Sequence, residues 1–202
     1  VLFFCISGSG AILFFCVQVY TSIFLKTTVK LPSDVVDKLC IYATITLFPL
    51  TVFCGWLSDK FGRKPIILAG IIFGAIFIIP TFYLLHILGN LYINSHIHRE
   101  TMAIGIFLAL IALTLSLSLV VGPQSAVLAE LFPAKNRNSA ATLAHNLAAG
   151  WIGGMLPMII TWINQTWSNN FAGLWYPVSF LSIAALISFF MLPETVALDI
   201  TE

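Results

Sequence analysis

The sequence contains very few charged side chains. Only 8% of its 202 residues are Asp, Glu, Lys or Arg, whereas 59% are hydrophobic. Soluble domains carry roughly a quarter charged residues, so this composition excludes an ordinary soluble protein and indicates an integral membrane protein. Nine basic and eight acidic residues give a net charge of +1. This balance offers no surplus of positive charge with which to bind a nucleic acid.

Cysteine is also scarce, and the cysteines do not form a cluster. They are scattered through apolar stretches, at Cys5, Cys16, Cys40 and Cys54. In such stretches we expect them to pack as small hydrophobic residues rather than to form disulfides or to bind a metal. The sequence therefore predicts no metal site and no cofactor. The chain also begins at Val1 without a basic segment before its first apolar run, which favours a truncated chain over a cleavable signal peptide.

Charge-free intervals predict six transmembrane helices. Each span needs about 20 apolar residues, so six spans account for nearly the whole chain. Short polar or charged segments separate the spans, among them the stretch 164–170. The predicted spans cover about residues 3–25, 39–58, 65–88, 101–129, 139–163 and 173–192, and a short cytoplasmic tail follows at 193–202. The expected fold is an all-α membrane protein with a single six-helix bundle and no room for an extramembrane domain.

The distribution of basic residues predicts the orientation of this bundle. An even number of spans places both termini on the same side of the membrane. Lys60, Arg63 and Lys64 crowd together at one helix end. Dense positive charge next to a span favours the cytoplasmic side, so we expect both termini in the cytoplasm.

The segment 55–65, Gly-Trp-Leu-Ser-Asp-Lys-Phe-Gly-Arg-Lys-Pro, joins the second predicted span to the third. Gly55 would let another helix approach closely, and Gly62 permits a tight reversal of the chain. Asp59 is placed to cap the following helix or to pair with Arg63. The spacing alone leaves two interpretations open.

In the first interpretation, this segment is a plain helix hairpin with a basic turn. In the second, Asp59 together with Arg63 and Lys64 forms a charge latch between two helix ends, which breaks and re-forms during function. Arg63 and Lys64 would then reach a helix end or lipid phosphates as the latch opens.

This segment resembles a loop signature of the major facilitator superfamily, Gly-x-Leu-x-Asp-(Arg/Lys)-x-Gly-Arg-(Arg/Lys), and it matches the signature at every fixed position. In that superfamily the signature connects helices two and three, and it recurs in degraded form between helices eight and nine. One predicted span precedes the helix that leads into it here. This placement fits either six-helix half of such a protein.

Two further segments resemble the carboxyl-terminal half. Glu130, Pro133 and Arg137 fit the pattern Glu-x-Phe-Pro-x-x-x-Arg, which lies between helices ten and eleven of the superfamily. The segment 192–195, Leu-Pro-Glu-Thr, resembles the Pro-Glu-Thr that follows the last helix. The resemblance therefore implies helices seven to twelve, a half-bundle whose amino-terminal six-helix partner is missing.

The segment 146–157 resembles one branch of the superfamily, the metabolite:proton symporters, and among them most closely the transporters of proline and betaine. This resemblance implies a non-enzymatic, proton-coupled symporter for a small zwitterionic or organic-acid solute, in the inner membrane of a bacterium. It would work by alternating access with an amino-terminal half. The alternatives are half of a sugar-porter-type, dicarboxylate or shikimate transporter, or a truncated membrane protein without transport activity.

Small and polar residues in the fifth predicted span are candidates for contact with a solute. On an ideal helix, Asn146, Gly150, Gly153 and Pro157 share one face. This face would either line a cavity, with Asn146 as a hydrogen-bond partner, or pack closely against another helix.

The first and fourth predicted spans add two amides. A stripe along the first span contains Gly10, Phe14, Gln18 and Ser22, and the fourth span contains Gln124. Gln18 and Gln124 would contact a solute or form hydrogen bonds between helices.

His145 is the one ionisable candidate well inside a predicted span, about six residues or roughly 9 Å from its cytoplasmic end. Proton relays usually need an ionisable group within the membrane, and no Asp, Glu, Lys or Arg lies near the middle of a predicted span. His145 therefore has either a proton-linked role or a purely structural one. The resemblance implies that most coupling residues lie in the amino-terminal half.

An intramembrane enzyme with Ser7 or Ser9 as nucleophile and His145 as base is a poor alternative. The serines lie in an unbroken apolar run without the strand-to-helix turn that exposes such a nucleophile.

Overall fold

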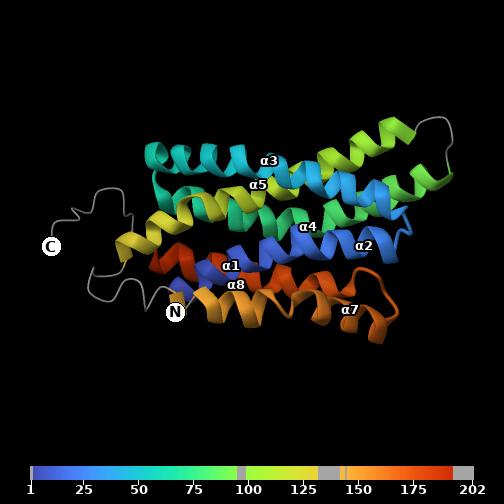
Figure 1. Ribbon diagram of the computed structural model, residues 1–202. Helices are drawn as coiled ribbons and strands as arrows, with labels where there is room; N and C mark the ends of the chain where they lie inside the picture. The colour runs from blue at the N-terminus through green and yellow to red at the C-terminus, as the bar shows by residue number, and fades with distance from the viewer. Residues whose placement is uncertain (1, 95–98, 132–141, 144, 193–202) are drawn as a thin grey trace.

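The computed structural model describes residues 2–94, 99–131, 142–143 and 145–192. Six helical segments in this part of the chain are long and apolar enough to cross a membrane, and they run alternately up and down one bundle (Figure 1). They are Cys5–Thr27, Ser33–Phe61, Arg63–Asn94, Arg99–Val127, His145–Trp167 and Ala172–Met191. The predicted all-α bundle with six spans is confirmed.

The first span is the most deeply buried and contains a change of helix type. It consists of α1 (Leu2–Phe14), the π-helix η1 (Phe15–Tyr20) and α2 (Thr21–Thr27). In the π-helix the Thr21 Oγ1 donates to the Cys16 carbonyl oxygen, five residues earlier, at 3.0 Å. A helix that is apolar on all sides is expected in a core, and this span packs against α5, α8 and the fifth span.

The next three helices are longer than the predicted spans. They are α3 (Ser33–Phe61), α4 (Arg63–Asn94) and α5 (Arg99–Leu131), with 29, 32 and 33 residues. At 1.5 Å per residue they are about 44 to 50 Å long, whereas the hydrocarbon core is about 30 Å thick. The sequence prediction ended each span at its last apolar residue. The helices continue into the charged and polar residues beyond each span. There, outside the hydrocarbon, the backbone can keep the same i→i+4 hydrogen bonds.

The fifth span ends later than predicted, whereas the sixth agrees with the prediction within one residue at each end. The fifth contains the π-helix η2 (Ala148–Gly153) and α7 (Leu156–Trp167), and the sixth contains the short η3 (Ala172–Leu174) and α8 (Trp175–Met191). The predicted loop at 164–170 therefore begins later, after Trp167. Asn164 belongs to the last turn of α7, where its side chain forms several hydrogen bonds.

The side chain of Asn164 ties the end of α7 to its neighbours. Its Nδ2 donates to the Tyr20 hydroxyl at 3.1 Å and to the Asn170 carbonyl at 3.0 Å. Its Oδ1 accepts a hydrogen bond from the Gly173 backbone N–H at 2.7 Å. A polar residue that closes so many hydrogen bonds is compatible with a helix end inside a bundle.

Aromatic side chains form the core at this end of the bundle. Phe24 and Phe82 are almost completely buried, and their ring centroids lie 5.2 Å apart in an edge-to-face arrangement. Tyr20 lies 5.4 Å from Phe82, and Phe171 lies 6.0 Å from Phe24. Such contacts join the first, third and sixth spans.

The helices α3 and α5 cross at two glycines. A Cβ atom added to Gly122 would lie 2.9 Å from both the Gly55 backbone nitrogen and the Thr51 carbonyl oxygen. Real Cβ atoms do not approach backbone atoms so closely, so the crossing requires glycine at position 122. Pro123 follows directly within α5. Small residues commonly allow such close approaches between membrane helices. Gly55 lies at this crossing, as its sequence predicted, with an added Cβ atom 3.7 Å from the Gly122 carbonyl oxygen.

We predict that Gly122→Ala destabilises the bundle by about 1–3 kcal/mol, because backbone atoms cannot move aside as a flexible side chain can. Gly150→Ala is the matched control, since a Cβ atom there would meet no other atom within 4 Å. The midpoint of thermal unfolding in detergent should fall for Gly122→Ala and stay level or rise for Gly150→Ala. Equal midpoints for the two variants would contradict the close crossing.

Candidate functional site

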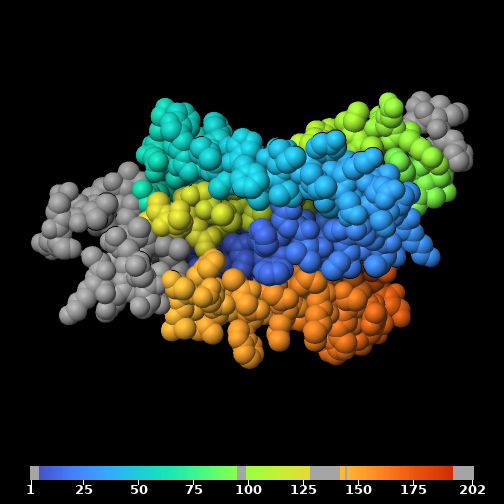
Figure 2. Space-filling model, viewed as in Figure 1, coloured from blue at the N-terminus to red at the C-terminus, as the bar shows by residue number. Residues whose placement is uncertain are grey.

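A cavity of about 530 Å³ lies between α1, α5 and the beginning of the fifth span. In Figure 2, α1 lies recessed between α5 and the fifth span on this face of the molecule. The cavity is lined by Gly10, Ala11, Phe14, Phe15, Val121, Gln124, Ser125, His145 and Ala149. Two of the amide and imidazole groups predicted as candidates, Gln124 and His145, are therefore brought together.

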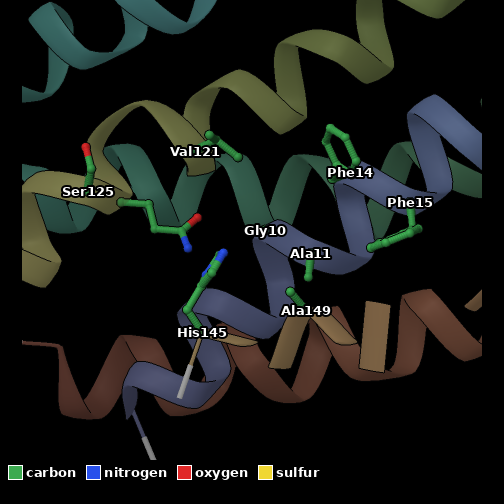
Figure 3. A pocket seen from close by; sticks show the side chains of 9 residues that line it. Gly10, Ala11, Phe14, Phe15, Val121, Ser125, His145 and Ala149 are labelled. Carbon is green, nitrogen blue, oxygen red and sulfur yellow. The ribbon is translucent and has the colours of Figure 1, made fainter. Parts of the chain in front are cut away.

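The polar groups of this first cavity come from two sides. Gln124 is only 7% exposed, and its Nε2 donates to the Ser7 Oγ at 3.4 Å. A Cβ atom at Gly10 would lie 2.6 Å from the Gln124 Oε1, so glycine leaves room for the amide against α1. From the opposite side, His145 projects its ring into the cavity (Figure 3). The cavity thus offers an amide, an imidazole and the aromatic ring of Phe14.

The first cavity is set back from the nearer end of the bundle. Gln124 is seven residues from Leu131, the last residue of α5. At 1.5 Å per residue this places the amide about 10 Å from that helix end. The α3–α4 turn lies at the same end of the bundle (Figure 1). The cavity therefore occupies the half of the bundle that is nearer to this turn.

A second cavity, of about 420 Å³, lies between the first span and α3. Its lining residues are Gln18, Ser22, Asp37, Cys40, Ile41, Thr44 and Ile45. The Thr44 Oγ1 donates to the Gln18 Oε1 at 2.9 Å. The buried Gln18 Nε2 has no hydrogen-bond partner among the described residues. Gln18 therefore reaches a cavity, as the sequence suggested, but a different one from Gln124.

The predicted stripe of the first span lines both cavities. Gly10 and Phe14 line the first, whereas Gln18 and Ser22 line the second. In an ideal α-helix, residues four apart drift by about 40° per step, so three steps would rotate the stripe by about 120°. The i→i+5 bonding of η1 turns the chain less per residue and reverses part of this drift. The stripe residues that line the two cavities therefore stay closer to one face of the first span than in an ideal α-helix.

The other predicted cavity residues lie elsewhere. Asn146 and Gly150 are exposed in a groove of the fifth span that Trp151 and Met155 also line. Gly153 instead packs against α1, where an added Cβ atom would lie 2.8 Å from the Ala11 Cβ. The shared face expected for an ideal helix is not formed, because the π-helix η2 changes the register between Gly150 and Gly153.

The turn between α3 and α4 contains the ion pair that its sequence suggested. The Asp59 Oδ1 lies 3.5 Å from the Arg63 Nη2, with Asp59 64% exposed. Gly62 ends α3 with φ of 98°, a conformation that favours glycine, and its N–H donates to the Ser58 carbonyl at 3.0 Å. The Arg63 side chain is only 15% exposed, so the carboxylate is the partner that faces solvent. At 3.5 Å and with a solvent-facing carboxylate, this pair adds little stability.

Two lysines of the same turn lie over aromatic rings. The Lys60 ammonium lies 4.0 Å from the centroid of the Trp56 ring, and the Lys64 ammonium lies 5.9 Å from that of Phe189. Lys64 therefore connects this turn to the end of α8.

The second predicted motif is only partly described. Glu130 belongs to the last turn of α5. Pro133 and Arg137 lie outside the described residues, as does the predicted tail at 193–202.

Sequence reasoning missed the polar residues that α3 contributes. Asp37 and Thr44 line the second cavity, and the Lys26 Nζ contacts the Asp37 Oδ1 at 2.6 Å. One signal was available, because the short connection between the first two spans keeps Lys26 near Asp37. The pairing of Thr44 with Gln18 depends on the rotation of two helices, which no local pattern specifies.

Comparison with known proteins places these features in a family. Residues 1–202 match the model of the family described as sugar (and other) transporter. The glycine betaine/proline/ectoine/pipecolic acid transporter OusA of Dickeya dadantii is 33% identical over 138 residues, which cover 68% of this chain and 25% of that protein. The proline/betaine transporter of Escherichia coli is 31% identical over 134 residues, covering 66% of this chain and 23% of the relative.

A third relative has a different solute in its name. The shikimate transporter of Escherichia coli is 26% identical over 139 residues, which cover 68% of this chain and 28% of that protein. The matched region therefore spans about a quarter of the length of these curated relatives.

Proposed function

This chain belongs to the sugar (and other) transporter family of the major facilitator superfamily, and we propose that it forms the carboxyl-terminal half of a solute transporter with two six-helix halves. The six spans and the segment 55–65, with its ion pair of Asp59 and Arg63, support this assignment. So does the match to a quarter of the length of relatives that are named as transporters.

The observation that carries the proposal is the common face of the two cavities. A stripe of the first span lines a cavity nearer to each end of the bundle. Transporters of this architecture bind their solute near the midplane between two bundles and alternate access by rocking one bundle against the other. The face with both cavities is the one that an amino-terminal half would cover.

We propose a small zwitterion, such as proline or betaine, as the solute. The names of the relatives support this class, and so does the chemistry of the first cavity. Gln124 offers an amide donor to a carboxylate, and the Phe14 ring offers its face to a quaternary or secondary ammonium. An organic acid would use the amide but not the ring, which makes shikimate the natural competitor in a test.

We also propose that transport is coupled to protons. His145 places an imidazole in the first cavity, and histidine side chains commonly carry protons in proteins. One imidazole can carry only one proton. We therefore expect most of the residues that couple transport to protons in the amino-terminal half. The charged side chains of the described spans lie near the helix ends, as the membrane interior requires.

We predict that both termini lie in the cytoplasm of a bacterium, because Lys60, Arg63 and Lys64 crowd at one end of the bundle. In a variant without the native cysteines, Phe61→Cys should react with an impermeant thiol reagent only after the cells are permeabilised. Phe61 is 69% exposed, so the position is accessible in the folded protein. Lys30→Cys, at the opposite end, should react in intact cells. The reverse pattern would overturn the orientation.

We predict that residues 1–202 alone do not accumulate solute. One bundle has half a binding site and no second bundle to move against. In liposomes with an imposed proton gradient, radiolabelled proline or betaine should accumulate with the complete two-half transporter and not with the half alone. Accumulation by the 202 residues without a second polypeptide would show that one bundle suffices. Competition by shikimate but not by betaine would favour the organic-acid alternative.

We predict that Asp59→Asn in the complete transporter slows uptake about fivefold, since losing about 1 kcal/mol in one conformation changes a rate by roughly that factor. The folded yield should change little, because Asp59 is largely exposed and such pairs contribute less than about 1 kcal/mol to stability. A latch acts on the balance between two conformations, so its loss affects rate more than folding. Asp34→Asn, an exposed carboxylate at the other end of α3, is the control and should leave both unchanged. Equal losses of rate and yield would make Asp59 purely structural.

A further inference from the structure

The second cavity has a buried end and a charged rim. At the buried end, the Gln18 Oε1 accepts from Thr44, while the Gln18 Nε2 has no partner among the described residues. At the rim, Asp37 lines the cavity and pairs with Lys26 at 2.6 Å. Ser22 lies one helical turn from Gln18 and also lines this cavity.

The spacing of these groups fits a compact zwitterion. Asp37 and Thr44 are seven residues apart on α3, so about 10 Å of helix separates the rim from the residue that holds Gln18. A hydrogen bond of roughly 3 Å to the carboxylate of the solute and an ion-pair contact of about 4 Å to its ammonium leave room for one carbon atom between the two groups. The unused donor of Gln18 requires an acceptor, and Asp37 requires a cation.

Lys26 occupies the place of that cation. Its ammonium contacts the carboxylate of Asp37, yet Lys26 is not among the residues that line the cavity. Both side chains of this pair are partly exposed, at 34% for Lys26 and 54% for Asp37. A flexible lysine at such a site can swing away when another cation approaches.

We propose that this second cavity is a separate binding subsite for the zwitterionic solute, at the end of the bundle opposite to the Asp59 turn. The carboxylate of the solute accepts from the Gln18 Nε2 and from Ser22, and its cation replaces the Lys26 ammonium at Asp37. The same stripe of the first span leads from this subsite to the first cavity. The proposal rests on the proposed transport of a zwitterion and adds a second place where that zwitterion binds.

Cys40 provides a probe, because it lines the second cavity and is partly exposed, whereas Cys5, Cys16 and Cys54 are buried. We predict that glycine betaine slows the labelling of Cys40 severalfold. The experiment uses the complete transporter in membranes, with Cys40 as its only cysteine, and a water-soluble methanethiosulfonate reagent. Sucrose at equal osmolarity is the solute control and should leave the labelling rate unchanged.

Substitutions of the two partners of the ion pair should have opposite effects on the protection of Cys40 by betaine. Asp37→Asn removes the acceptor for the cation, so betaine should no longer protect Cys40. Lys26→Gln removes the competing ammonium, so protection should persist at an equal or lower betaine concentration. A purely structural ion pair would give the same loss in both variants, and that result would overturn the subsite.

Two further measurements distinguish this subsite from binding at the first cavity and from the proposed transport function. Gln124→Leu alters the first cavity, and protection of Cys40 should survive it; loss of protection there would mean that Cys40 reports a conformational change caused by binding elsewhere. Betaine uptake without protection of Cys40 would refute the subsite and leave the proposed function intact. Protection without uptake would support the subsite and refute the transport function, and the absence of both would refute both.

Discussion

Hydrocarbon offers no hydrogen-bond partners to a polypeptide backbone, and the structure depends on this constraint. All six spans are helical because a helix satisfies its backbone internally. Departures from the α-helix keep their bonds in another pattern: in η1 the Cys16 carbonyl accepts from the Thr21 hydroxyl, and after η2 the Gly154 N–H donates to the Ala149 carbonyl. Both π-helices lie beside the first cavity. The constraint therefore leaves the chain a way to turn side chains towards a solute without breaking a helix.

The same constraint explains which features could be predicted from the sequence. The six spans and the ion pair of Asp59 with Arg63 follow from local patterns, since apolar length and an i,i+4 spacing are properties of a single segment. Only some of the predicted cavity residues line the two cavities. Gln124 and Gln18 line cavities, whereas Gly153 turned away from Asn146 and Gly150 because η2 changes the register, and a π-helix has no clear sequence signature. The position of α3 relative to the first span, which brings Thr44 to Gln18, is a property of two helices together.

The two ends of the bundle hold ion pairs of different construction. Asp59 and Arg63 lie one turn apart around the reversal at Gly62, so their pairing follows from the turn itself. Lys26 and Asp37 belong to different helices and close the connection between α2 and α3. Neither pair contributes much to folding, because the carboxylate of each is largely exposed and its attraction is offset by hydration and side-chain entropy. Weak pairs suit a protein that must pass between conformations of similar free energy, since a strong one would trap a single state.

Polar side chains line the two cavities along the first span. Elsewhere the helices present large apolar side chains, such as Phe48, Met158 and Phe190, which are compatible with lipid. The cavity face instead presents the amide of Gln18 and the imidazole of His145. A polar group left without a partner in hydrocarbon costs about 1–3 kcal/mol, so lipid is a poor neighbour for this face. Water and a second bundle are better ones, and only the second bundle can also exclude the solute from one side of the membrane while the other side is open. This preference is a physical argument for the proposed pairing of the chain with an amino-terminal half.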